Sequence, residues 1–237
     1  MDMVCEEAPY LDGFTHQGIL TGARRVWVEA CDSIISALNV HSGYNLVVTG
    51  HSLGAGVAVL ITLELLLGES TSALPVGTDV RCIALAPPPV YLASKSIFSN
   101  SLPASVSEKI EIYIHHHDCV PRMSLGSLTR LLISMRAVDN LAMTVTQQIN
   151  MLRDNTDEVT EELLAKVVEA VKRSKQDKFP FLQHPGKIFY LKKEQGDAPG
   201  YVVLQEESKV FTNRLYILEG MVNDHRGLSY EEALNLL

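Results

Sequence analysis

The sequence predicts an α/β fold in which a mostly parallel sheet is flanked by helices. Strand patterns alternate with helical periodicity along the chain, which is typical of parallel sheets covered by helices. The length of 237 residues fits one such domain, since these sheets commonly run as single units of roughly 200–250 residues. Hydrophobic residues make up 46% of the chain, as a sizeable core requires. We therefore expect a single domain over residues 1–237.

The expected strands are short apolar runs bounded by turn residues. They lie at residues 46–49, 80–85, 110–114, 187–191, 201–204 and 215–218. Three consecutive prolines at 87–89 end the second of them. The fourth and fifth flank a segment from Gly196 to Gly200 and are expected to form a hairpin.

The expected helices are segments with apolar residues at helical spacing or with strong helix compatibility. They lie at residues 18–38, 55–67, 127–135, 141–153, 157–175 and 230–236. The third to fifth fall within residues 124–181, a segment without a strand pattern. A helical insertion of this length between two core strands is expected to form a cap over one face of the sheet. The alternative is a solvated decoration with no role at a functional site.

Composition argues against several classes of protein. Lys and Arg number 20 and Asp and Glu 28, a net charge of −8 without any basic run, which argues against a nucleic acid partner. The four cysteines lack C-x-x-C or zinc-type spacing, so reduced thiols of an intracellular protein are expected. The acidic N-terminus does not resemble a signal peptide. The longest apolar stretch, residues 57–67, is too short to span a membrane and contains Glu64. A cytoplasmic or peripheral membrane location is expected.

The most informative motif is the G-x-S-x-G pattern at residues 50–54, which follows an apolar strand and precedes a helix. A nucleophilic serine at the tip of such a turn sits in strained backbone, and residues two before and two after it crowd the turn unless they lack a Cβ. Gly50 and Gly54 meet that need, with Ser52 as the candidate nucleophile. The alternative is a glycine-rich turn that carries an incidental serine.

A nucleophilic serine needs a base, and the base needs an orienting acid. In an α/β-hydrolase these follow the serine in the order acid, then histidine. Asp118 follows strand 110–114 and has the position expected of the acid. The alternative is an exposed loop aspartate.

Eight histidines compete for the role of base. The side chain of His51 is expected to point away from that of Ser52, because neighbouring residues of a strand face opposite sides. His184 begins a strand and should lie at the wrong edge of the sheet. His225 follows the last candidate strand and precedes the terminal helix, so it is the expected base, with His184 as second choice.

The consecutive histidines His115, His116 and His117 lie beside the candidate acid. They are too close to Asp118 in sequence to span from it to the serine. Such a run can indicate a metal site, but no matching carboxylate or cysteine pattern accompanies it, so no metal is expected. No cofactor is expected either, and calcium dependence stays open.

Several segments, in chain order, are similar to the class 3 lipases, which have the α/β-hydrolase fold. These segments are residues 15–19 (THQGI), 50–56 (GHSLGAG), 118–122 (DCVPR), 184–188 (HPGKI) and 224–225 (DH). The long helical insertion most resembles that of the sn-1-specific diacylglycerol lipases. So does the tail over residues 211–236, with Tyr230, Ala233 and Leu234 in its last helix.

The resemblance implies hydrolysis of an acylglycerol ester through an acyl-enzyme, with diacylglycerol giving monoacylglycerol and a fatty acid. It also implies a lipid substrate and transient contact with a membrane surface. Ser52 would attack the ester carbonyl, His225 would transfer the proton, and Asp118 would fix the imidazole tautomer. The backbone N–H of Leu53 would supply one oxyanion donor.

The chain departs from this family at its N-terminus. Class 3 lipases carry a second oxyanion donor in an Arg-Gly-Ser/Thr-type loop well upstream of the position of His16, and the 15 residues before His16 lack that pattern. Strands that should flank the strand before Ser52 are missing as well, which would leave an unpaired edge. We therefore expect an N-terminally truncated, partial lipase domain of undetermined oligomeric state. The alternative function is a catalytically impaired regulatory or lipid-binding module.

Overall fold

The computed structural model describes most of the chain. The described residues are 7–68, 70, 74–93, 102–140, 144–146, 149, 161–173, 182–194, 200–212, 215 and 217–237. Among them, no helix has the length and apolar character needed to cross a membrane.

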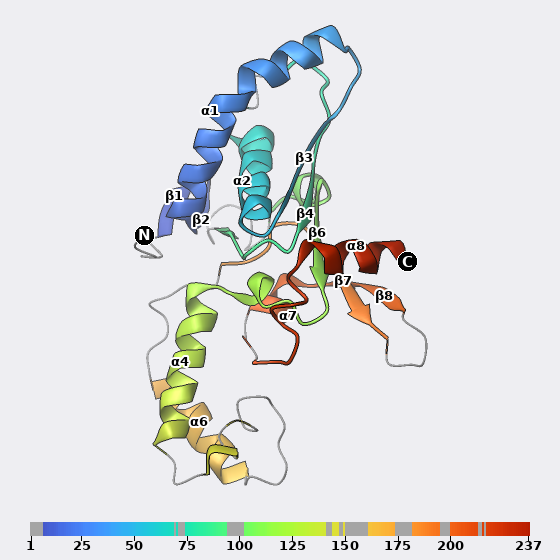
Figure 1. The fold of residues 1–237 in the computed structure, drawn as a ribbon. Helices are drawn as coiled ribbons and strands as arrows, with labels where there is room; N and C mark the ends of the chain where they lie inside the picture. The colour runs from blue at the N-terminus through green and yellow to red at the C-terminus, as the bar shows by residue number, and fades with distance from the viewer. Residues whose placement is uncertain are drawn as a thin grey trace.

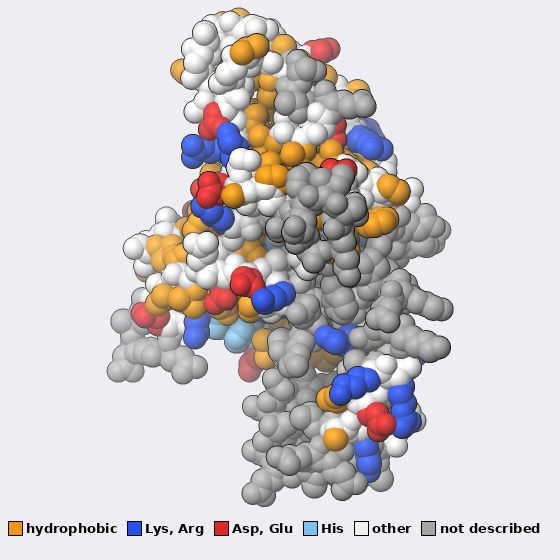
Figure 2. All heavy atoms as spheres, turned by 180° about the vertical axis from the view of Figure 1, so that it is seen from behind, with side chains coloured by type: hydrophobic (Ala, Val, Ile, Leu, Met, Phe, Trp, Pro, Cys, Tyr) orange, Lys and Arg blue, Asp and Glu red, His pale blue; other side chains and the backbone are white. Residues whose placement is uncertain are grey.

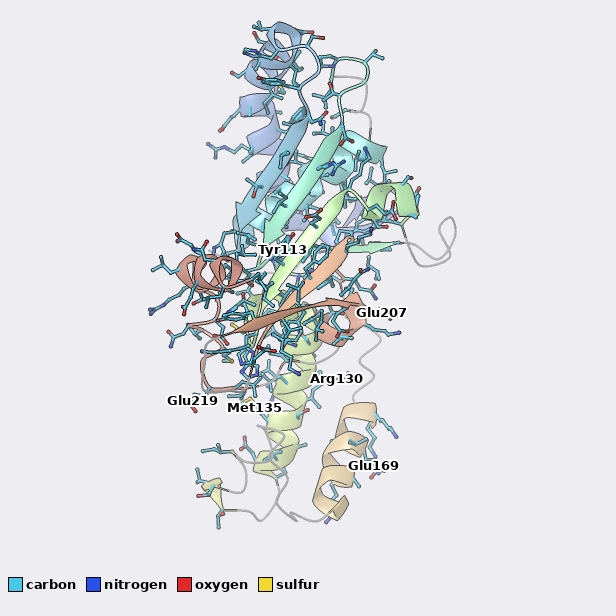
Figure 3. The ribbon with its side chains drawn as sticks, turned by 90° about the vertical axis from the view of Figure 1, so that its right-hand side faces the viewer. Tyr113, Arg130, Met135, Glu169, Glu207 and Glu219 are labelled. Carbon is cyan, nitrogen blue, oxygen red and sulfur yellow. The ribbon has the colours of Figure 1, made fainter. Side chains whose placement is uncertain are left out.

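A five-stranded, mostly parallel sheet forms the centre of the fold, as predicted (Figures 1 and 3). In spatial order its strands are β3 (Leu46–His51), β4 (Val80–Leu85), β6 (Ile110–His115), β7 (Lys187–Lys193) and β8 (Tyr201–Glu206). The first four run parallel, and β8 pairs with β7 as the expected antiparallel hairpin. In the described part of the chain, β3 lies at one edge of this sheet.

Helices α1 (Gln17–Val40) and α2 (Leu53–Leu67) lie on one side of this sheet (Figure 1). Alternate residues of β4 and β6 face the core and are fully buried, among them Cys82, Ala84 and Ile112. Helix α2 is apolar nearly all round, as a helix enclosed by other elements requires. It packs between α1 and the sheet. Because Ser52 lies directly before α2, this packing fixes the position of the serine at the end of β3.

The opposite face of β3 and β4 carries Val47 and Ile83, whose exposed fractions are 50% and 38%. This alternation of buried and exposed residues has the period of two that strands impose. Figure 2 shows hydrophobic side chains reaching the surface on the side seen from behind, with charged side chains scattered among them.

A second, antiparallel sheet was not predicted. It consists of β1 (Glu7–Tyr10), β2 (Gly13–His16) and β5 (Tyr91–Ala93). These strands are too short to show a periodic pattern. Gly13 permits their close pairing, because a Cβ there would lie 2.2 Å from the carbonyl oxygen of Leu92.

The strand predicted at residues 215–218 is wrong for the described residues of that segment, which have no strand structure. The main sheet ends at β8, and the chain leaves it through the short helix α7 (Ser208–Thr212), in which Phe211 is buried. The remaining short elements are α3 (Ala104–Ser107), the 3-10 helix η2 (Val120–Arg122) and α8 (Gly227–Asn235).

The insertion at residues 124–181 contains α4 (Leu125–Asp139) and α6 (Glu161–Arg173), near two of the predicted helices. Helix α4 begins with a capping box between Ser124 and Ser127. The two helices pack on each other and extend away from the end of the sheet, lying against neither of its faces (Figures 1 and 3). The expected cap over one face is therefore not what these helices form. The helix predicted at 141–153 lies largely outside the described residues.

Candidate active site

Ser52 lies at a sharp turn between β3 and α2. Its backbone angles are φ 57° and ψ −127°, a strained conformation for a residue with a side chain. The Ser52 N–H donates to the carbonyl oxygen of Leu85 at 2.9 Å, so β4 holds the turn in place. The arrangement of strand, strained serine and helix is that of a nucleophile elbow.

Only one of the two glycines of this motif is required by crowding. A Cβ on Gly50 would lie 2.4 Å from the carbonyl oxygen of Gly54, which no packing adjustment of a side chain could relieve. Outside its own helical turn, a Cβ on Gly54 would meet no described residue within 4 Å. The described residues outside its own helical turn therefore give no crowding reason for a glycine at position 54, and the expected need for one there stays a prediction.

The structure brings Ser52, His225 and Asp118 together in one chain of hydrogen bonds. Ser52 Oγ lies 2.8 Å from His225 Nε2. His225 Nδ1 lies 3.0 and 3.1 Å from the two carboxylate oxygens of Asp118. Asp118 is fully buried, whereas the side chain of His225 is 23% exposed. The serine can therefore lose its proton to a histidine whose other nitrogen is held by a buried anion.

Asp118 receives further hydrogen bonds that sequence patterns did not reveal. The backbone N–H of Val120 donates to Oδ1 at 2.9 Å, and the Tyr230 hydroxyl donates to Oδ2 at 2.7 Å. Tyr230 is itself fully buried and accepts from the N–H of His115 at 2.9 Å. Burial, followed by the charge of Asp118, raises the pKa of Tyr230 well above its ordinary value, so the hydroxyl stays protonated and donates.

His51 contacts the candidate base although it is not the base itself. Its Nε2 donates to the backbone carbonyl oxygen of His225 at 2.9 Å, and the two ring centroids are 4.9 Å apart. The residue before the nucleophile thus holds the backbone of the residue that would deprotonate it. The sequence motif offered no sign of this contact, because the two residues are 174 positions apart.

The second-choice base, His184, is located elsewhere. Its Nε2 donates to the carbonyl oxygen of Pro121 at 2.8 Å, and the residue is buried. Burial lowers its pKa to about 4, so the ring is neutral near pH 7. Its contacts support the loop after Asp118 and leave the position beside Ser52 to His225.

Leu53 is the first residue of α2 and follows Ser52 directly. The N–H groups of a first helical turn have no acceptor within the helix. The Leu53 N–H is therefore available beside the serine, at the positive end of the helix dipole.

Comparison with known proteins places the chain in a family. The family described as Lipase (class 3) matches residues 1–127, more than half of the chain. The chain belongs to the class 3 lipase family.

A curated relative is diacylglycerol lipase-beta of Mus musculus, with 36% identity over 122 residues. That match covers 51% of this chain and 16% of the relative, so it spans about one sixth of the relative's length.

Solved lipases share the fold at low sequence identity. The lipase–propeptide complex of Rhizomucor miehei has a TM-score of 0.52 at 17% identity and covers 94% of this chain and 54% of that one. A lipase from Rhizopus microsporus var. chinensis has a TM-score of 0.50 at 18% identity and covers 94% and 58%. A structure described as a triacylglycerol lipase whose catalytic centre is a serine protease triad has a TM-score of 0.52 at 15% identity and covers 94% and 63%.

Proposed function

We propose that this class 3 lipase hydrolyses an acylglycerol ester through an acyl-enzyme on Ser52. Its proposed substrate is diacylglycerol, and the proposed products are monoacylglycerol and a fatty acid. The observation that carries the proposal is the continuous hydrogen-bond chain from Ser52 through His225 to the buried Asp118. Ser52 itself lies at a strained turn between a strand and a helix, which is typical of the nucleophile in an α/β-hydrolase.

In the first half of the reaction, Ser52 Oγ attacks the ester carbonyl carbon while its proton passes to His225 Nε2. The tetrahedral intermediate collapses when His225 returns that proton to the departing glycerol oxygen. In the second half, His225 takes a proton from water, and the resulting hydroxide attacks the acyl group on Ser52. In the collapse of this second intermediate the bond from the acyl carbon to Ser52 Oγ breaks and His225 returns its proton to Oγ, which releases the fatty acid and restores the serine. These steps use no cofactor.

The surroundings of the triad favour each charged species that forms. Asp118 stabilises the imidazolium and keeps the proton of neutral His225 on Nδ1. The Tyr230 and Val120 donors hold the carboxylate in position. The Leu53 N–H would stabilise the oxyanion, and removing one such donor typically costs about 3–4 kcal/mol of barrier.

The proposed substrate class has two supports. Class 3 family membership favours an acylglycerol, and the mouse relative is named a diacylglycerol lipase. Because acylglycerols reside in membranes or droplets, we also propose transient contact with a lipid surface.

A lipid-binding module without catalysis would have no need for all three groups at hydrogen-bond distance. The geometry therefore favours hydrolysis over that alternative.

The test is hydrolysis of mixed vesicles by the purified 237-residue chain. Diacylglycerol, monoacylglycerol, triacylglycerol and phosphatidylcholine are offered separately, and fatty acid release is measured. Diacylglycerol should be the best substrate, and Ser52→Ala should lower its turnover by at least about 10³-fold. Equal turnover by a folded Ser52→Ala variant would contradict the mechanism, and preference for another lipid would contradict only the substrate.

A further inference from the structure

We propose that His116, His117 and Asp224 form a binding site for one divalent transition-metal ion of the zinc type. One ligand atom from each of these residues lies within 4.8 Å of the others. All three residues are partly buried, beside the triad but outside it.

The fold assembles this cluster from two distant segments. Strand β6 ends at His115, and His116 turns the chain sharply with φ 35°. The rings of His116 and His117 stack with centroids 3.7 Å apart. Asp224 arrives from the loop before α8, where its carboxylate oxygen Oδ2 accepts from the His117 N–H at 3.1 Å. The sequence did not predict a metal because it shows no carboxylate at metal-ligand spacing, and folding supplies that carboxylate.

An unsatisfied atom in the cluster points to a ligand. His116 Nδ1 is buried, and no described residue offers it a hydrogen bond. Leaving a polar atom buried and unpaired is costly, so such atoms usually have a partner that folding or binding supplies. A metal ion coordinated by the cluster would supply it.

The backbone of Asp224 is already held by a neighbouring histidine. His115 Nδ1 donates to the backbone carbonyl of Asp224 at 3.1 Å and lies 3.7 Å from its Oδ1. Its Nε2 is engaged by the hydroxyl of Tyr201 at 3.0 Å. His115 is therefore a supporting residue and not a fourth ligand. Such outer partners orient the ligands of protein metal sites.

Ligand chemistry selects the class of ion. Two imidazoles and one carboxylate suit zinc and its neighbours, whereas calcium and magnesium prefer oxygen ligands throughout. Ligand atoms on a tetrahedral zinc ion lie about 3.3 Å apart, so the three groups, now within 4.8 Å of one another, would have to approach. The two imidazole rings, now stacked with their planes 25° apart, would also have to turn so that a nitrogen of each points at the ion. Water would occupy the fourth position.

The location gives the ion a consequence for the catalytic loop. Asp224 directly precedes His225, so an ion shared with His116 and His117 would fasten the loop that carries His225 to the end of β6. It would take no part in ester chemistry. The ion's binding can be measured without turnover, so its test and that of the proposed function fail independently.

The experiment is calorimetric titration of the metal-free chain with zinc sulfate. One ion should bind per chain, and His116→Gln and His117→Gln should each weaken binding at least about tenfold. His41→Gln is the matched control, because His41 is exposed and stacked on Tyr44 away from the cluster. No binding to the wild-type chain, or binding unchanged in both cluster variants, would overturn the proposal.

A second measurement covers the event that a histidine variant does not fold. Asp224→Asn keeps an oxygen that can accept from the His117 N–H and removes the anionic ligand. Cobalt(II) added to the wild-type chain should give the intense visible absorption of a four-coordinate site, and Asp224→Asn should lose it. Absence of that absorption from the wild-type chain, or its persistence in Asp224→Asn, would contradict the site.

Discussion

Gly50→Ala tests whether the elbow depends on close backbone contact. The added Cβ would lie 2.4 Å from the oxygen and 2.5 Å from the carbon of the Gly54 carbonyl, and 2.7 Å from the Ala55 nitrogen. All three are backbone atoms, so the start of α2 must shift. Overpacking in a core typically costs about 1–3 kcal/mol, and we expect the upper end, about 3 kcal/mol. For a chain of this size that lowers Tm by roughly 6–12 °C.

Gly54→Ala is the matched control, because its Cβ would meet none of the described residues outside its own helical turn within 4 Å. Alanine in place of a helical glycine stabilises by at most about 1 kcal/mol. Urea unfolding of both variants and the wild-type chain measures the free energies. Gly54→Ala should be the most stable of the three chains, the wild type the next and Gly50→Ala the least stable. A Gly50→Ala variant as stable as Gly54→Ala would refute the crowding argument.

Two further predictions concern Tyr230, which contacts the triad, and His184, which supports the loop after Asp118. Tyr230→Phe removes a hydrogen bond to the Asp118 carboxylate, worth about 1.5–3 kcal/mol, so kcat should fall roughly 10–100-fold with KM unchanged. Steady-state kinetics on diacylglycerol vesicles measure both constants, and a Tyr230→Phe variant with the kcat of the wild-type chain would contradict the positioning role of this hydroxyl. Burial lowers the pKa of His184 from 6.5 to about 4 in the folded chain. Between these two pH values the unfolded chain therefore binds more protons than the folded chain. The stability that neutral His184 contributes above pH 6.5 is lost as the pH falls toward 4. Urea unfolding should therefore show the advantage of wild type over His184→Gln shrinking by roughly 3 kcal/mol between pH 7 and pH 4, and a constant difference would contradict the burial argument.

Local patterns and chain order were enough to predict the main sheet and the three residues of the triad. Ser52 was readable because its turn needs a fixed spacing of glycine and serine. Asp118 and His225 were readable because each follows a strand or strand-like segment in the order typical of α/β-hydrolases. These signals depend on neighbours in sequence or on topology, both of which a single chain displays.

The supporting contacts were not predictable, because they join distant segments. Tyr230 and Asp118 are 112 positions apart, and nothing near either residue signals their hydrogen bond. In the sequence, Asp224 looks like an ordinary loop residue. Its contact with His117 exists only because the fold brings the loop before α8 to the end of β6. The cap was predicted from length alone, and length cannot fix the direction in which α4 and α6 extend from the sheet.

The most direct test of the central claim is covalent labelling of Ser52 by a fluorophosphonate probe. Activated serines react with such probes, and peptide mapping identifies the modified residue. Wild-type chain should carry one adduct on Ser52, while Ser52→Ala should carry none and His225→Gln should label at least about 10³-fold more slowly. Folded wild-type chain that does not label, or His225→Gln that labels at the wild-type rate, would contradict the proposed triad.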